Sequence, residues 1–286
     1  MRLIIDADVL PGTIERLRAL SPDLEVVDRT GDPTFDVSTL DDGAVEVLIG
    51  GGAPDDLGRV PSLRWLQVRS AGVDHMTADP PWQKGLLVTN AKGVYAVPIG
   101  EYVSGMVLRV HQPAATWSAD QAAHHWPDEP SLIDPIRGKT AVIAGYGSIP
   151  ERIVGDDGLL DGVREADVLV LTMPLTDASR GVIGREVLAA LPPRAWLINV
   201  SRGALVDEPA LLEALRADRL AGAVLDVFGE EPLPADSPWW DAPNVIVTPH
   251  ASGHTLRFFD ELVVENVRRY LAGEPLLNPV DPERGY

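Results

Sequence analysis

The chain has 286 residues, 45% of them hydrophobic and 23% charged, which suits one large or two ordinary globular domains and excludes a disordered protein. It has no cysteine, which excludes disulfides, thiolate metal sites and cysteine nucleophiles, and no metal site is predicted. The formal net charge of −19 argues against a nucleic-acid partner, and no apolar run approaches the roughly 20 residues of a membrane span. Because Asp6 and Asp8 interrupt the first apolar stretch, where a signal peptide stays apolar, we expect a cytoplasmic protein with no membrane partner.

Short apolar runs alternate with helical patterns in the first third of the chain. A helix is expected at residues 13–20. Strands are expected at residues 3–6, 24–27, 45–49, 63–68 and 86–90. Continuous apolar strands separated by helices favour a parallel sheet that is covered on both faces.

A long helix is expected at residues 98–108, followed by a loop-rich crossing over residues 112–138, where the periodicity is weak. A second alternating unit then begins, with a helix at residues 208–216 and an amphipathic helix from about residue 255 to residue 271. Its strands are expected at residues 140–144, 167–172, 195–200, 223–227 and 245–248. The pattern predicts two doubly wound units.

Gly145-Tyr146-Gly147 directly follows a predicted strand. In a dinucleotide-binding fold the first glycine makes a tight turn and the second lets the backbone approach the pyrophosphate. Ordinary turns also use this spacing, and with the preceding strand the two interpretations are evenly balanced.

Polar residues follow three later strands: Arg202, Asp226 and His250. Ligands of open α/β sheets bind outside the carboxyl ends of the strands, so we expect these side chains to converge on one crevice. Taken alone, His250 fits a structural histidine and Arg202 a surface ion pair, but their shared position favours a site. Glu231 lies in a proline-bounded loop nearby, where it is either an ordinary acidic loop residue or a carboxylate that fixes the tautomer of a histidine.

Three blocks of the sequence, residues 199–207, 225–234 and 243–250, resemble the signature blocks of the D-isomer-specific 2-hydroxyacid dehydrogenases. Residues 70–75, 88–94 and 101–103 are similar to that family as well, so the resemblance covers nearly the whole chain. It implies an α/β protein with two doubly wound parallel-sheet domains. A flavodoxin-like substrate domain would comprise residues 1–94 plus 256–286, and an inserted Rossmann dinucleotide-binding domain residues 95–255.

The resemblance also implies an oxidoreductase that transfers hydride between NAD or NADP and a small 2-hydroxy or 2-keto acid, and that forms a homodimer. Arg202 would hold the substrate carboxylate and polarise the keto oxygen, a task that suits a planar two-pronged donor. His250 would be the acid/base and Glu231 its partner. Asp226 would contact the nicotinamide amide.

Further binding residues are implied by the same resemblance. Backbone N–H groups of Ala71 and Gly72 would also bind the substrate carboxylate. The cofactor-binding residues would be Gly145, Gly147, Ser148, Ile149, Met173, Pro174, Val200, Ser201, Asp226 and Gly253.

One departure from the family concerns Pro150, which stands where the fingerprint has its third glycine. In the family a helix follows this glycine, and then a strand that ends in an acid about 20 residues further on. Neither this helix nor this strand is evident before the strand at residues 167–172. The dinucleotide-binding domain therefore lacks a helix–strand segment near residue 150, on the order of thirty residues.

Two explanations stay open. The first is that the natural protein has a further segment at the abrupt join Pro150-Glu151, which this sequence lacks; the intact Arg202, Glu231 and His250 favour this explanation. The second is that the deletion is real, which the continuous numbering supports. A real deletion favours an alternative function: a non-catalytic or cofactor-impaired relative that acts as a binding protein, like the corepressors of the family.

Overall fold

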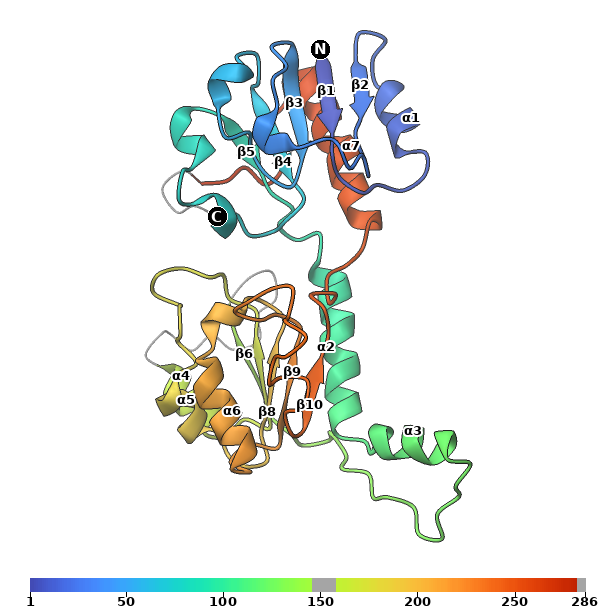
Figure 1. Ribbon diagram of the computed structural model, residues 1–286, viewed down its shortest axis with the longest axis vertical. Coiled ribbons are helices and arrows are strands. Elements are labelled where there is room, and N and C mark those ends of the chain that lie inside the picture. Colours follow the sequence, from blue (N-terminus) through green and yellow to red (C-terminus); the bar gives the residue numbers. More distant parts are fainter. Residues whose placement is uncertain (146–157, 282–286) are drawn as a thin grey trace. The chain divides into compact units, whose positions relative to one another are not determined.

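The computed structural model describes residues 1–145 and 158–281. The chain forms two compact units, Met1–Tyr95 with Thr255–Tyr286, and Ala96–His254 (Figure 1). The join at Pro150-Glu151 lies outside the described residues, and so do Gly147, Ser148 and Ile149. Across the two described ranges, no helix combines the length and apolar character needed to span a bilayer.

The first unit contains a sheet of parallel strands in the order β2-β1-β3-β4-β5. This is the flavodoxin-like order, which confirms the predicted class for this unit. The strands are β1 (Arg2–Ile5), β2 (Glu25–Asp28), β3 (Val45–Gly50), β4 (Trp65–Val68) and β5 (Leu87–Thr89), and the helices are α1 (Thr13–Arg18), α7 (Arg257–Ala272), η1 (Val37–Thr39), η2 (Leu57–Arg59), η3 (Asp74–Met76) and η4 (Pro81–Lys84).

Helix α7 completes the core of this unit, although it is far from the other elements in the sequence. Its apolar face, which includes Phe259 and Val263, is buried in the same cluster as Leu3 and Ile49 of the sheet. The buried Asp260 side chain accepts hydrogen bonds from the Leu10 N–H at 2.8 Å and from the Thr13 hydroxyl at 2.5 Å. The predicted amphipathic closing helix is therefore confirmed.

The second unit contains a parallel sheet in the order β10-β9-β8-β7-β6. Its strands are β6 (Ala141–Ala144), β7 (Val168–Leu171), β8 (Trp196–Asn199), β9 (Gly222–Leu225) and β10 (Val245–Val247). Its helices are α2 (Ala96–Val110), α3 (Ala114–Ala122), α4 (Leu159–Val163), α5 (Arg185–Ala190), α6 (Glu208–Arg216) and η6 (Gly203–Leu205).

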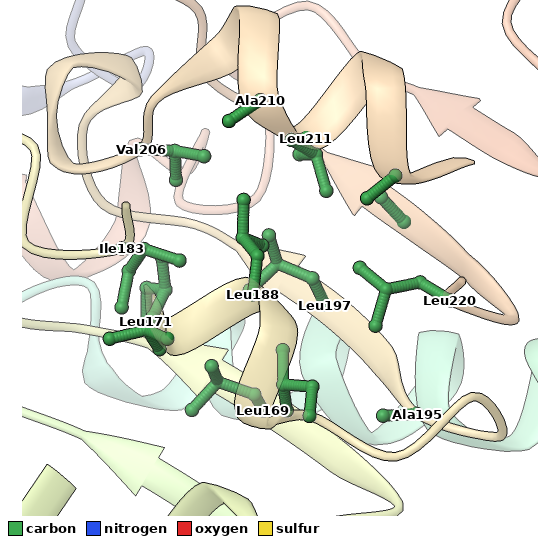
Figure 2. Packing of buried hydrophobic residues seen from close by; sticks show 14 of the residues in the cluster. Leu169, Leu171, Ile183, Leu188, Ala195, Leu197, Val206, Ala210, Leu211 and Leu220 are labelled. Atoms are coloured by element: carbon green, nitrogen blue, oxygen red, sulfur yellow. The ribbon is translucent and has the colours of Figure 1, made fainter. Parts of the chain in front are cut away.

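Helices cover both faces of this second sheet, as continuous apolar strands require. Helices α4, α5 and α6 pack on one face, where Leu188 of α5 and Leu211 of α6 face Leu197 of β8 (Figure 2). Residues of α2 pack on the other face, against a cluster that includes Val170 and Val224. The prediction of two parallel-sheet α/β units is confirmed.

The loop-rich crossing predicted for residues 112–138 is wrong over Ala114–Ala122, which forms helix α3. Four of its nine residues are alanine, the strongest helix former, but they create no apolar stripe with the period of a helix. After α3 the chain runs without helix or strand to Thr140. In Figure 1, α3 and the loop after it stand away from the sheet of their unit. Trp126 and Leu132 in this loop are each 93% exposed.

Candidate active site

Those predicted site residues of the second unit that the structure describes gather at one edge of its sheet. Because β6 to β10 are all parallel, their carboxyl ends lie at the same edge, where ligands of such sheets bind. Going along the chain, the residues that follow these ends are Gly145 after β6, Met173 and Pro174 after β7, Val200, Ser201 and Arg202 after β8, Asp226 after β9, and His250 and Gly253 after β10.

His250 and Glu231 form a hydrogen-bonded pair. The Nδ1–H of His250 donates to Oε2 of Glu231 at 2.8 Å, so the carboxylate selects the tautomer with the proton on Nδ1. The His250 side chain is 50% exposed, which leaves the imidazole open to a ligand. Its Nε2 is therefore the ring atom that is available to exchange a proton with a substrate.

The backbone at His250 has φ = 52°, a left-handed conformation that L residues seldom adopt. Two hydrogen bonds hold it there: the His250 N–H donates to the backbone oxygens of Asp226 at 2.8 Å and of Thr248 at 3.1 Å. Uncommon backbone geometry of this kind is concentrated at functional sites.

Glu231 is itself held in place by the backbone. Its Oε1 accepts a hydrogen bond from the Phe228 N–H at 2.8 Å, while Oε2 is used by His250. The Gly229 N–H in turn donates to the Glu208 carboxylate at 2.6 Å, which ties the loop to the start of α6. Both carboxylate oxygens of Glu231 are thus fixed before any substrate arrives.

Arg202 projects from a turn that Asn199 organises. The Asn199 side chain, at the end of β8, accepts a hydrogen bond from the Ser201 N–H at 3.1 Å and donates to the Arg202 backbone oxygen at 2.9 Å. The Arg202 guanidinium is partly buried and donates to the Ser201 backbone oxygen at 2.8 Å. The turn therefore places a fork-shaped cation at the same sheet edge as His250.

Gly203 lets the Arg202 turn and the Glu231 loop approach each other. A Cβ atom at this position would lie 2.0 Å from the Phe228 carbonyl carbon and 2.3 Å from the Gly229 nitrogen. Both are backbone atoms that cannot move aside. Only glycine permits this close approach of the two segments.

Asp226 organises the segment that carries His250. It is fully buried, and its carboxylate accepts hydrogen bonds from the Thr248 hydroxyl at 2.5 Å and from the N–H groups of Ala251 and Ser252, both at 2.9 Å. These bonds give Asp226 a positioning role. Its predicted contact with a nicotinamide amide stays a prediction.

Tyr102 of α2 extends this network across the sheet. Its hydroxyl lies 2.7 Å from the Thr248 hydroxyl, so the two share a hydrogen bond. Burial raises the pKa of Tyr102 above its usual value, and the nearby Asp226 charge adds to this effect. The hydrogen bond with Thr248 lowers the pKa and offsets part of the rise. The phenol is therefore protonated at neutral pH and acts as a neutral support.

The carboxyl ends of β6 and β7 fit one end of a nucleotide cofactor. Gly145 has φ = 124°, and a Cβ atom there would lie 2.4 Å from the Met173 nitrogen, so two backbones come together as a phosphate-binding turn requires. The Ser201 hydroxyl donates to the Met173 backbone oxygen at 2.5 Å and joins this pair to β8. The predicted role of these residues in holding a nucleotide cofactor stays a prediction.

Ala71 and Gly72 belong to the first unit, in the loop between β4 and η3. Their predicted contact with a substrate carboxylate stays a prediction.

Sequence reasoning assigned no site role to Thr248, Tyr102, Asn199 or Gly203. Thr248 and Asn199 were recognisable only as polar residues at strand ends. The contact of Gly203 with Phe228 joins residues that are distant in sequence and leaves no local signal.

Comparisons with known proteins agree with this geometry. The family model described as "D-isomer specific 2-hydroxyacid dehydrogenase, NAD binding domain" matches residues 151–252. The glyoxylate/hydroxypyruvate reductase B of Pectobacterium carotovorum is 32% identical over 88% of this chain and 89% of its own length. The (S)-sulfolactate dehydrogenase of Chromohalobacter salexigens is 30% identical over 83% of this chain and 91% of its own.

Solved structures agree as well. A D-isomer specific 2-hydroxyacid dehydrogenase from Xanthobacter autotrophicus, in complex with NADPH and MES, has a TM-score of 0.78 and 31% identity and covers 100% of this chain and 99% of its own. An NADPH-dependent glyoxylate/hydroxypyruvate reductase from Sinorhizobium meliloti, in complex with NADP and sulfate, has a TM-score of 0.80 and 27% identity at the same coverage.

These relatives are longer than the present chain within the aligned region. The alignment with the Pectobacterium reductase has 288 positions but takes in 88% of the 286 residues here, about 252. The difference, 288 minus 252, leaves about 36 positions that the relative alone fills. The family-model match begins at Glu151, the residue directly after the abrupt join.

Proposed function

The chain belongs to the D-isomer specific 2-hydroxyacid dehydrogenases, and from this we propose that it reduces small 2-keto acids to 2-hydroxy acids with NADH or NADPH. The observation that carries the proposal is the His250–Glu231 pair, at the same sheet edge as Arg202 in the unit that matches the NAD-binding model. The named relatives that share this unit are enzymes, which gives no support to a non-catalytic binding protein.

Arg202 binds the substrate in this proposal. Its guanidinium carries paired N–H donors in one plane, which match a carboxylate and the neighbouring keto oxygen. The positive charge also stabilises the negative charge that develops on the keto oxygen during reduction. The Asn199 hydrogen bonds fix the turn, so the fork is oriented before the substrate binds.

His250 supplies the proton. In the reductive direction Nε2–H donates its proton to the keto oxygen, which becomes the hydroxyl of the product. Glu231 accepts the Nδ1–H bond, holds the ring and stabilises the protonated imidazole that must be present before each turnover. In the oxidative direction the neutral Nε2 takes the same proton back.

The bound cofactor, NADH or NADPH, supplies the hydride that attacks the keto carbon. Gly145, Met173 and Ser201 are the described residues that would contact the cofactor, and the hydrogen bonds of Asp226 hold the segment that carries His250.

The decisive experiment is the oxidation of NADH and NADPH with glyoxylate, hydroxypyruvate and a bulkier 2-keto acid, followed by the loss of cofactor absorbance. We expect turnover with the small keto acids. Absence of turnover with all of them, in protein whose folding is verified by circular dichroism, would refute the proposal.

We propose in addition that the enzyme is a cytoplasmic homodimer. A cytoplasmic location is consistent with a reaction that consumes NADH or NADPH, because both cofactors are present in the cytoplasm. Exposed apolar side chains on α3 and the following loop, among them Trp117, Trp126 and Leu132, support a partner surface on the second unit, because patches of this kind usually mark interfaces.

A further inference from the structure

The strands of the second unit follow one another across the sheet in a single direction. From β6 at the edge, each later strand lies one place further on, in the order β10-β9-β8-β7-β6. A dinucleotide-binding sheet is built from two mononucleotide-binding halves, and the ligand lies across the point where the strand order reverses. In residues 96–145 and 158–254 the order does not reverse, so they build one half.

The chain is too short at this point to add the other half. Twelve residues, 146–157, separate Gly145 from Gly158. A parallel strand beside β6 would need a crossover of about a dozen residues before that strand begins, and a whole βαβ unit takes about 30. The Pectobacterium reductase alone fills about 36 positions of its alignment with this chain, which is similar in size to one βαβ unit.

Strand β6 has the exposure of a sheet edge. Ile143 is 59% exposed, whereas its register partner Val170 on β7 is buried. All four residues of β7 and all four of β9 are buried. The sheet therefore ends at β6 within the described residues, on the side where the adenosine half of a dinucleotide would lie.

Within residues 96–145 and 158–254, the acid that binds the adenosine ribose has no counterpart at the carboxyl end of the strands next to β6. In dinucleotide-binding folds it lies about 20 residues after the glycine-rich turn. Asp167 stands twenty residues beyond Gly147, but it precedes β7. Its carboxylate accepts hydrogen bonds from the Thr140 N–H at 2.8 Å and from Arg194 at 2.6 Å, at the amino ends of the strands.

We propose that this chain recognises only the nicotinamide mononucleotide half of its cofactor. The proposal rests on the proposed function and extends it to the cofactor's chemical class. Because the ribose acid, or an arginine in its place, is what distinguishes NAD from NADP, the chain does not discriminate between them. Reduced nicotinamide mononucleotide, NADH and NADPH bind with similar affinity, since the adenosine part adds no contacts.

The test is isothermal titration calorimetry of the 286-residue protein with reduced nicotinamide mononucleotide, NADH and NADPH. Near 0.15 M salt the screening length is about 8 Å, which limits the effect of the extra phosphate charge of NADPH. We expect the three dissociation constants to agree within about threefold, less than 1 kcal/mol. Two adenosine fragments, 5′-AMP and 2′,5′-adenosine bisphosphate, serve as probes of the missing half and should give no binding heat.

Parallel turnover assays with hydroxypyruvate separate this inference from the proposed function. Tighter binding of NADH or NADPH by tenfold or more, or binding of either adenosine fragment, overturns the inference, while turnover with NADH leaves the proposed function intact. Failure of all three nicotinamide ligands to bind overturns both.

Discussion

At the scale of single residues, the Glu231 carboxylate holds His250 in the orientation that the proposed proton transfer requires. One oxygen is held by the Phe228 N–H and the other by His250 Nδ1, so the carboxylate cannot rotate away. An imidazole held in this way needs no reorganisation when the substrate arrives, and such preorganisation lowers the barrier of the chemical step.

Removal of the imidazole tests this role. We expect His250→Ala to lower turnover by about 10²–10⁴-fold, the usual contribution of a positioned acid/base, with cofactor affinity preserved. Steady-state kinetics and a cofactor titration measure the two quantities. His125→Ala, which removes an exposed histidine of the loop after α3, is the matched control and should keep normal turnover. Wild-type turnover in His250→Ala would exclude the residue from the mechanism.

The shape of the Arg202 side chain, as well as its charge, is open to test. Arg202→Lys keeps the charge and loses the planar fork, so we expect kcat/KM for the keto acid to fall about 10–100-fold, equivalent to a charged hydrogen bond of about 1.5–3 kcal/mol. Arg216→Lys, at an exposed position on α6, is the control and should leave the kinetics unchanged. Unchanged kinetics in Arg202→Lys would identify Arg202 as a structural residue.

At the scale of elements, the site depends on segments that approach each other across the sheet edge. The Arg202 turn and the Glu231 loop meet at Gly203, and Asp226 ties β9 to the segment after β10. The geometry between Arg202 and His250 is therefore set by backbone packing.

A methyl group at Gly203 should separate these two segments. The new Cβ of Gly203→Ala would lie 2.0 Å from a backbone carbon, so we expect a loss of about 1–3 kcal/mol in the free energy of unfolding, typical of overpacking, and a larger loss of kcat/KM. Urea unfolding and kinetics measure the two effects. Gly162→Ala in α4 is the matched control, because a Cβ there meets no atom within 4 Å and alanine favours a helix. Equal stability and activity of the two variants would contradict this interpretation of Gly203.

Asp167, which directly precedes β7, leads to a prediction about the pH dependence of stability. The Thr140 N–H, assisted by Arg194, holds the pKa of Asp167 below its ordinary value. The stability that this carboxylate contributes is therefore complete above its unfolded pKa of about 3.9 and is lost as the pH falls through the lower folded value. We expect Asp167→Asn to lower the free energy of unfolding by about 1–3 kcal/mol at neutral pH, with a difference from wild type that shrinks in acid.

Urea unfolding at neutral pH and below about pH 4 checks this difference on both sides of the ordinary Asp pKa. Asp161→Asn, at an exposed position on α4, is the control and should change stability by less than about 0.5 kcal/mol. A difference for Asp167→Asn that is independent of pH would mean that its charge does not stabilise the fold.

The sequence could predict the elements whose apolar runs are local. All ten predicted strands are present, since each is a short buried stretch bounded by turn residues. Helix α3 could not be predicted from periodicity because its residues are mostly exposed. At the site, Arg202 and His250 were predicted from their positions at strand ends, Glu231 from its proline-bounded loop, and all three from the family resemblance. The hydrogen bonds of Asp226 to residues 248–252 could not be predicted from the sequence, because they depend on how β9 and β10 lie side by side.

At the scale of the whole molecule, the exposed apolar residues after α3 lead to a prediction about assembly. We expect a molar mass by light scattering of twice the 30.8 kDa of one chain. The double variant Trp126→Asp, Leu132→Asp places charges in the proposed interface and should give the single-chain mass. Leu271→Asp, on α7 of the first unit, is the control and should leave the mass unchanged. A single-chain mass for the wild type would exclude the homodimer.

The way α7 closes the first unit has a consequence for folding during synthesis. The sheet of that unit emerges from the ribosome early, but its covering helix follows only after the entire second unit has been made. The hydrogen bonds of Asp260 to Leu10 and Thr13 span 250 and 247 residues, so their formation carries the entropy cost of closing a long loop. The nascent first sheet therefore has α1 on this face but not yet α7, and we expect the docking of α7 to be a late step in folding.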